Sequence, residues 1–231
     1  MRAAFTELPE RGRSTDLERQ KQTKQKRLRR EIPLTHLLAR LQSVTNTSSI
    51  GPREGHASAA RIVRLRDGRT VALRIASAED GSAVQQFVRG LSTRSRRNRF
   101  FSPVRELSPD QLDRATCSRP PGALALVGES PQHAGSRIVA MAQYAVCEAR
   151  DAECAVVVDD GWQRQGLGVQ LLRLLAEHAE RAGLAAFTGF VLSDNWPMLA
   201  LLARLECEIV TDADPYTVRF AKRLDACRFA V

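Results

Sequence analysis

The chain of 231 residues lacks long apolar runs. Crossing a bilayer takes roughly 18 to 20 consecutive apolar residues, and no run approaches that length. The N-terminal stretch MRAAFTELPERGR also has no apolar core of the kind that a secretory signal requires. We therefore predict a cytoplasmic protein that makes no membrane contact.

Cysteine and histidine are few and scattered. The cysteines are odd in number and form no CxxC pair, and the histidines show no ligand spacing, which argues against a disulfide framework and against a zinc site. We expect reduced thiols and no metal ion. The residues are Cys117, Cys147, Cys154, Cys207, Cys227, His36, His56, His133 and His178.

Charge and apolar content divide the chain into two parts. Hydrophobic residues make up 43% of the sequence, enough for a globular core. The net charge of +9 is concentrated in residues 1–60, which hold 12 Lys/Arg against 6 Asp/Glu and include the run KQTKQKRLRR. We predict a basic extension over residues 1–60, largely disordered or partly helical, and a folded domain over residues 61–231. The basic run is typical of a solvated tail, with docking to an acidic partner or loose nucleic-acid contact as alternatives.

Residue patterns in the second part alternate between strands and helices. Asp67-Gly68 predicts a hairpin turn, and Ser77 and Ser108 are candidate N-caps of two helices. Strands are expected over 123–129, 137–148 and 153–159, then an amphipathic helix ending at Gly183, a strand, a short helix and a closing pair of strands. The order predicts an α/β (α+β mixed) fold, with a mixed sheet and helices on its faces.

The stretch VVVDDGWQRQGLG, residues 156–168, joins an apolar strand to that amphipathic helix. The glycines of QGLG let the backbone approach a bulky ligand, and the N-terminus of the helix favours an anion such as a diphosphate. A tight turn alone would also explain them. Asp159 and Asp160 are expected only to end the strand. Neither a Walker A loop nor a Rossmann fingerprint fits the spacing.

The pattern Gln-x-x-Gly-x-Gly after an apolar strand resembles the acyl-CoA loop of the GNAT N-acetyltransferases, and SDNWPM resembles their second cofactor element. The resemblance covers residues 61–225. It implies a mostly antiparallel mixed sheet of six to seven strands with about four flanking helices, and acetyl-CoA as acyl donor. The implied cofactor-binding residues are Val156, Val157, Val158, Gln163, Arg164, Gln165, Gly166, Leu167, Gly168, Val169, Asn195 and Met198.

Three longer stretches, beginning at Arg89, Glu153 and Asp194, resemble the GNAT domain of bacterial protein lysine acetyltransferases. That likeness implies transfer of acetyl to a protein lysine by direct attack in a ternary complex, with an acyl-CoA synthetase as a candidate substrate. It also implies that Glu153 is the general base, with Glu148 in reserve. We expect a monomer or a homodimer.

Two positions depart from the family pattern. Leu202 stands where many members have a tyrosine that acts as general acid, and Leu205-Glu206-Cys207 replaces the usual Gly-Phe pair. The first change leaves the source of the proton for the CoA thiolate open. The second puts the local turn geometry in doubt.

Two other functions remain open at this point. One is acetylation of a small-molecule amine on the same fold, and the other is a non-catalytic acyl-CoA sensor or nucleic-acid-associated module. SRRNRFFS, residues 95–102, has the arginines and aromatics of a nucleic-acid binder. The resemblance instead implies that Phe100 and Phe101 pack beside the acceptor cleft, so nucleic-acid binding is disfavoured.

Overall fold

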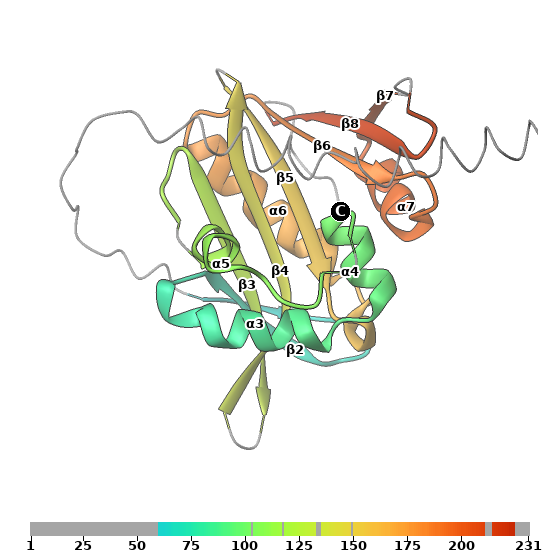
Figure 1. Ribbon diagram of the computed structural model, residues 1–231. Coiled ribbons are helices and arrows are strands. Elements are labelled where there is room, and N and C mark those ends of the chain that lie inside the picture. Colours follow the sequence, from blue (N-terminus) through green and yellow to red (C-terminus); the bar gives the residue numbers. More distant parts are fainter. Residues whose placement is uncertain are drawn as a thin grey trace, which may run out of the picture. The chain divides into compact units, whose positions relative to one another are not determined.

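The computed structural model describes residues 60–102, 104–116, 118–132, 135–148, 150–210 and 214–224. The predicted basic extension lies outside this part of the chain, apart from its last residue. The elements, shown in Figure 1, are β1 (Arg61–Arg64), β2 (Thr70–Ile75), η1 (Ala78–Asp80), α3 (Gly81–Gly90), α4 (Thr93–Phe100), α5 (Pro109–Thr116), β3 (Ala123–Gln132), β4 (Gly135–Glu148), β5 (Asp151–Val158), η2 (Asp160–Trp162), α6 (Leu167–Arg181), β6 (Ala186–Leu192), α7 (Trp196–Arg204), β7 (Glu208–Val210) and β8 (Thr217–Arg223).

The eight strands form one sheet in the order β1-β2-β3-β4-β5-β6-β8-β7. Every neighbouring pair is antiparallel except β5 and β6, which run parallel because α6 connects them. The sheet is therefore mixed and mostly antiparallel, as predicted.

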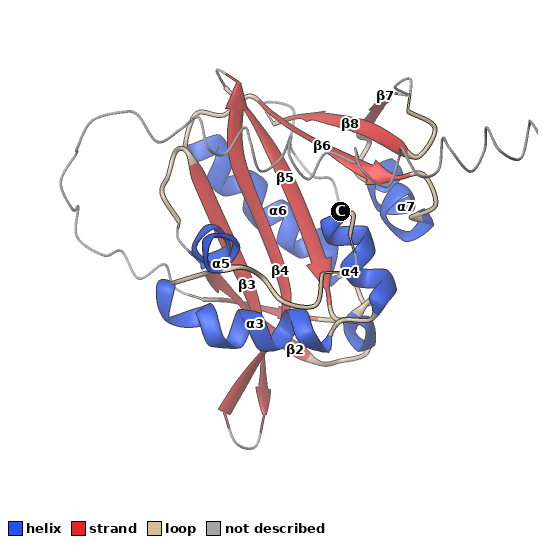
Figure 2. Ribbon diagram, in the orientation of Figure 1, coloured by secondary structure: helices blue, strands red, loops and turns tan. Residues whose placement is uncertain are grey.

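Helices cover both faces of the sheet (Figure 2). The apolar stripe of α6, centred on Leu171 and Leu175, packs with α7 against one face. Val84, Phe87 and Val88 of α3 pack with α5 against the other. Alternate residues of the strands supply the two cores, as the period of two in a β-strand requires.

The local predictions hold for most elements. Gly68 has φ 87° in the turn between β1 and β2, and Ser108 caps α5 by accepting a hydrogen bond from the Gln111 N–H at 3.3 Å. Gly183, with φ 80°, follows the end of α6. The numbers of strands and helices differ from the prediction. The sheet has eight strands rather than six or seven, and the described residues contain five α-helices rather than about four. The extra helix is α4, whose sequence TRSRRNRF has no apolar stripe to reveal it.

None of the described helices has both the length and the apolar character needed to span a membrane.

The turn after α7, where Leu205-Glu206-Cys207 stands, has a left-handed residue that is not glycine. Glu206 has φ 54°, in the left-handed region that favours glycine. Its N–H donates to the Ala203 carbonyl at 3.0 Å, and the Cys207 N–H donates to the Leu202 carbonyl at 3.0 Å. The helix end is therefore closed in the usual left-handed manner, with backbone strain at Glu206.

We expect Glu206→Gly to stabilise the protein by about 1 kcal/mol, because a side chain costs about 1–2 kcal/mol in the left-handed region. Ala203→Gly, at an exposed position within α7, is the matched control and should destabilise by about 1 kcal/mol. Urea unfolding of both variants checks this. Destabilisation by Glu206→Gly would show that the backbone is not strained.

Gly189 in β6 lies where three segments come very close. A Cβ at this position would stand 2.6 Å from Phe220 Cε1 and 3.0 Å from the Cys154 carbonyl oxygen. Phe220 is buried in the core, so its ring has little freedom to retreat. The absence of a side chain at Gly189 thus lets β6 lie against both β5 and the Phe220 ring.

Gly189→Ala should destabilise the fold by about 1–3 kcal/mol, the usual cost of forcing extra volume into a packed core. Gly81→Ala is the matched control, since a Cβ there would meet nothing within 4 Å and the residue is already helical. Denaturant midpoints should fall for the first variant and stay level or rise for the second. Equal effects of the two changes would contradict this account.

Candidate functional site

The parallel strands β5 and β6 part midway along their length, as Figure 2 shows. They pair only between Asp151–Glu153 and Ala186–Thr188. β5 continues to Val158 and β6 to Leu192 without further pairing to each other. Every second residue of the open stretch of β5 therefore turns its N–H and C=O toward the gap, where a ligand can bind them.

The predicted cofactor loop follows the open stretch of β5. Gly166 has φ 92° and is the N-cap of α6, and no side chain caps the helix there. The first turn of α6 therefore presents N–H groups that have no acceptor within the helix, together with the positive end of the helix dipole. Arg164 is exposed in the same loop, with φ 61°. This combination suits a diphosphate.

Contacts from other segments fix the loop in place. The Gln163 side-chain amide donates to the Val158 carbonyl at 3.0 Å and to Ser95 Oγ at 3.1 Å. The Gln165 carbonyl accepts from the N–H of Arg66 in the first hairpin. The guanidinium of Arg69 lies over the Trp162 ring, 3.8 Å from its centroid. Trp162 is therefore a packed loop residue, and the side chain of Gln163 already has a structural role.

The second predicted element lies beside the first. Asn195 is buried and caps α7 by accepting a hydrogen bond from the Met198 N–H at 3.4 Å. Met198 packs against the same core as α6. At Gly168 a Cβ would lie 3.6 Å from Leu201 Cδ2 and 4.0 Å from Val158 Cγ2, so the first turn of α6, the end of β5 and α7 meet at one place.

The other predicted residues of this group occupy the surroundings of that place. Leu167 is fully buried, and Val169 packs partly buried against the same core. Val156, Val157 and Val158 lie along the open stretch of β5, with Val156 and Val158 toward the α6 core and Val157 toward the α3 core.

Glu153 lies at the opposite end of the opening, in the last paired position between β5 and β6, opposite Thr188. It shares the face of β5 on which Val157 packs with α3. Val158 is five positions further along β5, about 17 Å along an extended strand. A ligand bound to the loop would need a long extended arm to bring its reactive end to Glu153.

Arg99 is partly buried in α4, a helix that packs against β5, the strand of Glu153. Burial lowers the pKa of Arg99 to about 10, and the negative charge of Glu153 opposes that shift. Its guanidinium lies over the Phe100 ring, 5.0 Å from the centroid. Helix α4 thus brings a cation to the part of the sheet where β5 carries Glu153.

Asp159 and Asp160 do more than end β5, which corrects the expectation from sequence. Asp159 pairs with Arg137 and caps η2 by accepting from the Gly161 N–H. Asp160 accepts hydrogen bonds from the Ser92 N–H at 2.9 Å, from Ser92 Oγ at 2.7 Å and from Ser95 Oγ at 2.8 Å. Ser92 is the N-cap of α4, a helix that the sequence analysis missed. Its capping pattern is the one local signal that could have indicated it.

Leu202 occupies the position at which the family resemblance led us to look for a tyrosine general acid. It is buried in the core beside α6, and its aliphatic side chain has no proton to donate. Among the described residues, no three metal-ligating side chains come together.

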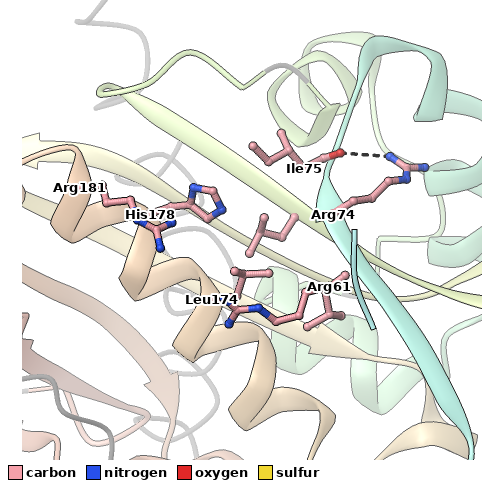
Figure 3. A pocket seen from close by; sticks show the side chains of 8 residues that line it. Arg61, Arg74, Ile75, Leu174, His178 and Arg181 are labelled. Atoms are coloured by element: carbon pink, nitrogen blue, oxygen red, sulfur yellow. Dashed lines mark hydrogen bonds between the residues drawn. The ribbon is translucent and has the colours of Figure 1, made fainter. Parts of the chain in front are cut away.

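A separate hollow lies between α6 and the first strands (Figure 3). It lies away from the cofactor loop, and its three arginines are already paired, Arg61 and Arg181 with Glu177 and Arg74 with Asp80. Burial lowers the pKa of His178 on its wall. The lining residues are Arg61, Leu73, Arg74, Ile75, Leu126, Leu174, His178 and Arg181.

Comparison with known proteins identifies a family whose members are similar to this chain. The model of the acetyltransferase (GNAT) family matches residues 91–206, from the start of α4 to the end of α7. Acetyltransferase PA5475 of Pseudomonas aeruginosa is 31% identical over 147 residues, which cover 63% of this chain and 77% of that protein.

Solved structures share the fold. The GNAT domain of S. lividans PAT superposes with a TM-score of 0.66 at 24% identity, over 74% of this chain and 99% of that one. The protein yncA of Salmonella typhimurium, solved with its cofactor acetyl-CoA, gives 0.53 at 17% identity, over 68% and 96%. A cAMP-binding acyltransferase from Mycobacterium smegmatis gives 0.51 at 23%, over 74% of this chain and half of that one.

The family match spans the loop, the parting strands and the second element together. The chain therefore belongs to the GNAT acetyltransferase family, whose enzymes use acetyl-CoA as the acetyl donor.

Proposed function

We propose that this enzyme acetylates the side-chain amine of a protein lysine by direct attack in a ternary complex, with Glu153 as general base. The observation that carries the proposal is the position of Glu153 in the last paired rung before β5 and β6 part. A group there meets the reactive end of any ligand that lies along the opening from the α6 loop. We also propose a cytoplasmic site of action, where the free cysteines among the described residues, Cys147, Cys154 and Cys207, would stay reduced.

The cofactor would be held by the chain's own backbone. The N–H groups of Gln163 to Val169 and the dipole of α6 would bind its diphosphate, with Arg164 adding charge. Asn195 and Met198 would contact it from α7, and Val156, Val157 and Val158 would line its arm. Bound acetyl-CoA supplies an activated thioester. A backbone N–H of the open stretch of β5 would stabilise the charge that develops on the carbonyl oxygen.

Glu153 would take the proton from the acceptor amine, directly or through one water. With a reference pKa near 10.4, only about one lysine in 2,500 is neutral at pH 7, so a base at this place raises the supply of nucleophile. With Leu202 in the tyrosine position, the proposal gives the chain no side chain that donates a proton to the thiolate.

The sheet beyond Glu153 favours a large acceptor. Thr188, Ala221 and Glu208 continue the row of Glu153 across β6, β8 and β7. The next row on the same face holds Phe190, Arg219 and Val210, all of them exposed. A protein surface could rest on these side chains while its lysine reaches Glu153.

One observation supports a small-molecule acceptor instead. Among the described residues Arg99 forms no ion pair within 4 Å, and its helix α4 packs against β5, the strand of Glu153. An amine that carries its own carboxylate, as an amino acid does, would place that carboxylate near Arg99 while its nitrogen meets Glu153. A panel of free amines with and without a carboxylate separates this function from the first.

The lysine proposal predicts discrete labelled proteins when the enzyme is incubated with radiolabelled acetyl-CoA and a bacterial lysate. Mass spectrometry should place the label on lysine Nζ, and an acyl-CoA synthetase is the first protein to examine. Release of free CoA thiol without any labelled protein would exclude protein lysine as the acceptor.

Glu153→Gln should lower kcat at pH 7 by about 10²-fold or more, the usual contribution of a general base. Its dissociation constant for acetyl-CoA should stay within about twofold of wild type, since the loop is unchanged. The lost activity should return as the pH rises toward the amine pKa. Glu148→Gln, at the end of β4, is the control and should be close to wild type. Equal loss in the two variants would remove Glu153 as the base.

A further inference from the structure

Helix α4 is held in place by polar contacts rather than by an apolar face. Ser95 is its one buried residue. Three hydrogen bonds to the Asp160 carboxylate hold its first turn, from the Ser92 N–H, Ser92 Oγ and Ser95 Oγ, at 2.7–2.9 Å. Hydrogen bonds to an ionised acceptor are stronger than neutral ones, so this one side chain supplies much of what fixes the helix.

The residues that hold α4 also belong to the two cofactor elements. Asp160 lies between the open end of β5 and the loop that starts at Gln163, and Gln163 bonds both Ser95 Oγ and the Val158 carbonyl. On the other side, Arg97 pairs with Asp194 at 2.9 Å, directly before Asn195. That second pair is exposed at both ends, which makes it the weaker tether.

The far end of α4 reaches the acceptor side. Helix α4 packs against β5, the strand that carries Glu153, and Phe100 packs against the α3 core. Phe101 ends the helix with φ 55°. A rotation or shift of α4 about its first turn would therefore displace Arg99 and Phe100 relative to Glu153.

We propose that Asp160 is a positioning residue for acetyl transfer, which holds α4 in register with the cofactor loop and so couples acetyl-CoA binding to acceptor binding. The inference rests on the proposed site, with the diphosphate at Gln163 to Val169 and the base at Glu153. A ligand that orders the loop orders Asp160 with it, and Asp160 then fixes the place of Arg99 and Phe100. Acceptor affinity thereby depends on the cofactor, and by linkage cofactor affinity depends equally on the acceptor.

The test is acceptor affinity with and without a bound, unreactive cofactor. Binding of a lysine peptide taken from a labelled protein is measured calorimetrically on the full chain, alone and saturated with desulfo-CoA. In the wild type we expect desulfo-CoA to tighten peptide binding about tenfold, within the usual range of coupling between sites. In Asp160→Asn this gain should fall to about twofold or less, while desulfo-CoA itself binds within about threefold of wild type.

Two further variants separate positioning from general damage. Glu106→Gln removes one charge from the exposed Arg89–Glu106 pair and should leave the coupling intact. Ser95→Ala removes a donor to Asp160 and an acceptor for Gln163, so by itself it should weaken the coupling in the same direction as Asp160→Asn. In steady-state kinetics Asp160→Asn should raise the acceptor KM about tenfold and the acetyl-CoA KM little.

Three outcomes would overturn the inference: no coupling in the wild type, full coupling in Asp160→Asn, or equal loss of coupling in Glu106→Gln. If no peptide is bound or acetylated, the lysine proposal fails, and the same four binding measurements are made with the small amine that the wild type acetylates. Loss of desulfo-CoA binding in Asp160→Asn would instead assign Asp160 to the cofactor site and also overturn the inference.

Discussion

The separation of β5 from β6 is the constraint on which the site depends. Parallel neighbours normally share hydrogen bonds along their common length, but here the pairing stops at Glu153 and Thr188. The open stretch of β5 leaves backbone groups for a ligand, and it leads directly into the glycine loop and the uncapped start of α6. In the proposed function, this one local departure from regular pairing would provide the binding surface, its direction and the place where a base is useful.

Contacts around the open stretch of β5 stabilise it. On its other side β5 stays paired with β4 from Asp151 to Val158, so the strand remains fixed while one edge is free. Gly189 lets β6 approach the carbonyl of Cys154 at the point of separation, and the Phe220 ring fills the space where a side chain would stand. Burial raises the pKa of the Cys154 thiol at this point, which keeps it neutral and unreactive.

Local patterns in the sequence predicted much of the fold. The Asp67-Gly68 turn, the Ser108 cap and the apolar spacing of α6 act over a few residues, and each lies where expected. Helix α4 was not predicted, because the hydrogen bonds that fix it come from Asp160, which lies 68 positions after Ser92 and 65 after Ser95. Such long-range contacts leave no periodic pattern in the sequence.

Long-range contacts also explain why parts of the site were not predicted from the sequence. Tertiary structure brings Asp160 to Ser92 and Ser95, so the sequence alone predicted only that Asp160 ends a strand. Gln163 was expected at the cofactor, and its side chain is instead bonded within the protein, which leaves its backbone for a ligand. Glu206 adopts a left-handed backbone conformation, which favours glycine, so the turn after α7 carries strain that the sequence pattern did not predict.

The central claim is that the opening between β5 and β6, together with the α6 loop, is the acetyl-CoA site. Amide hydrogen exchange with and without CoA tests it most directly. The account predicts slowed exchange at the backbone N–H groups of residues 154–158 and 163–169, with little change around the hollow at Arg61 and Arg181. Protection confined to that hollow, or no protection in either segment, would contradict it.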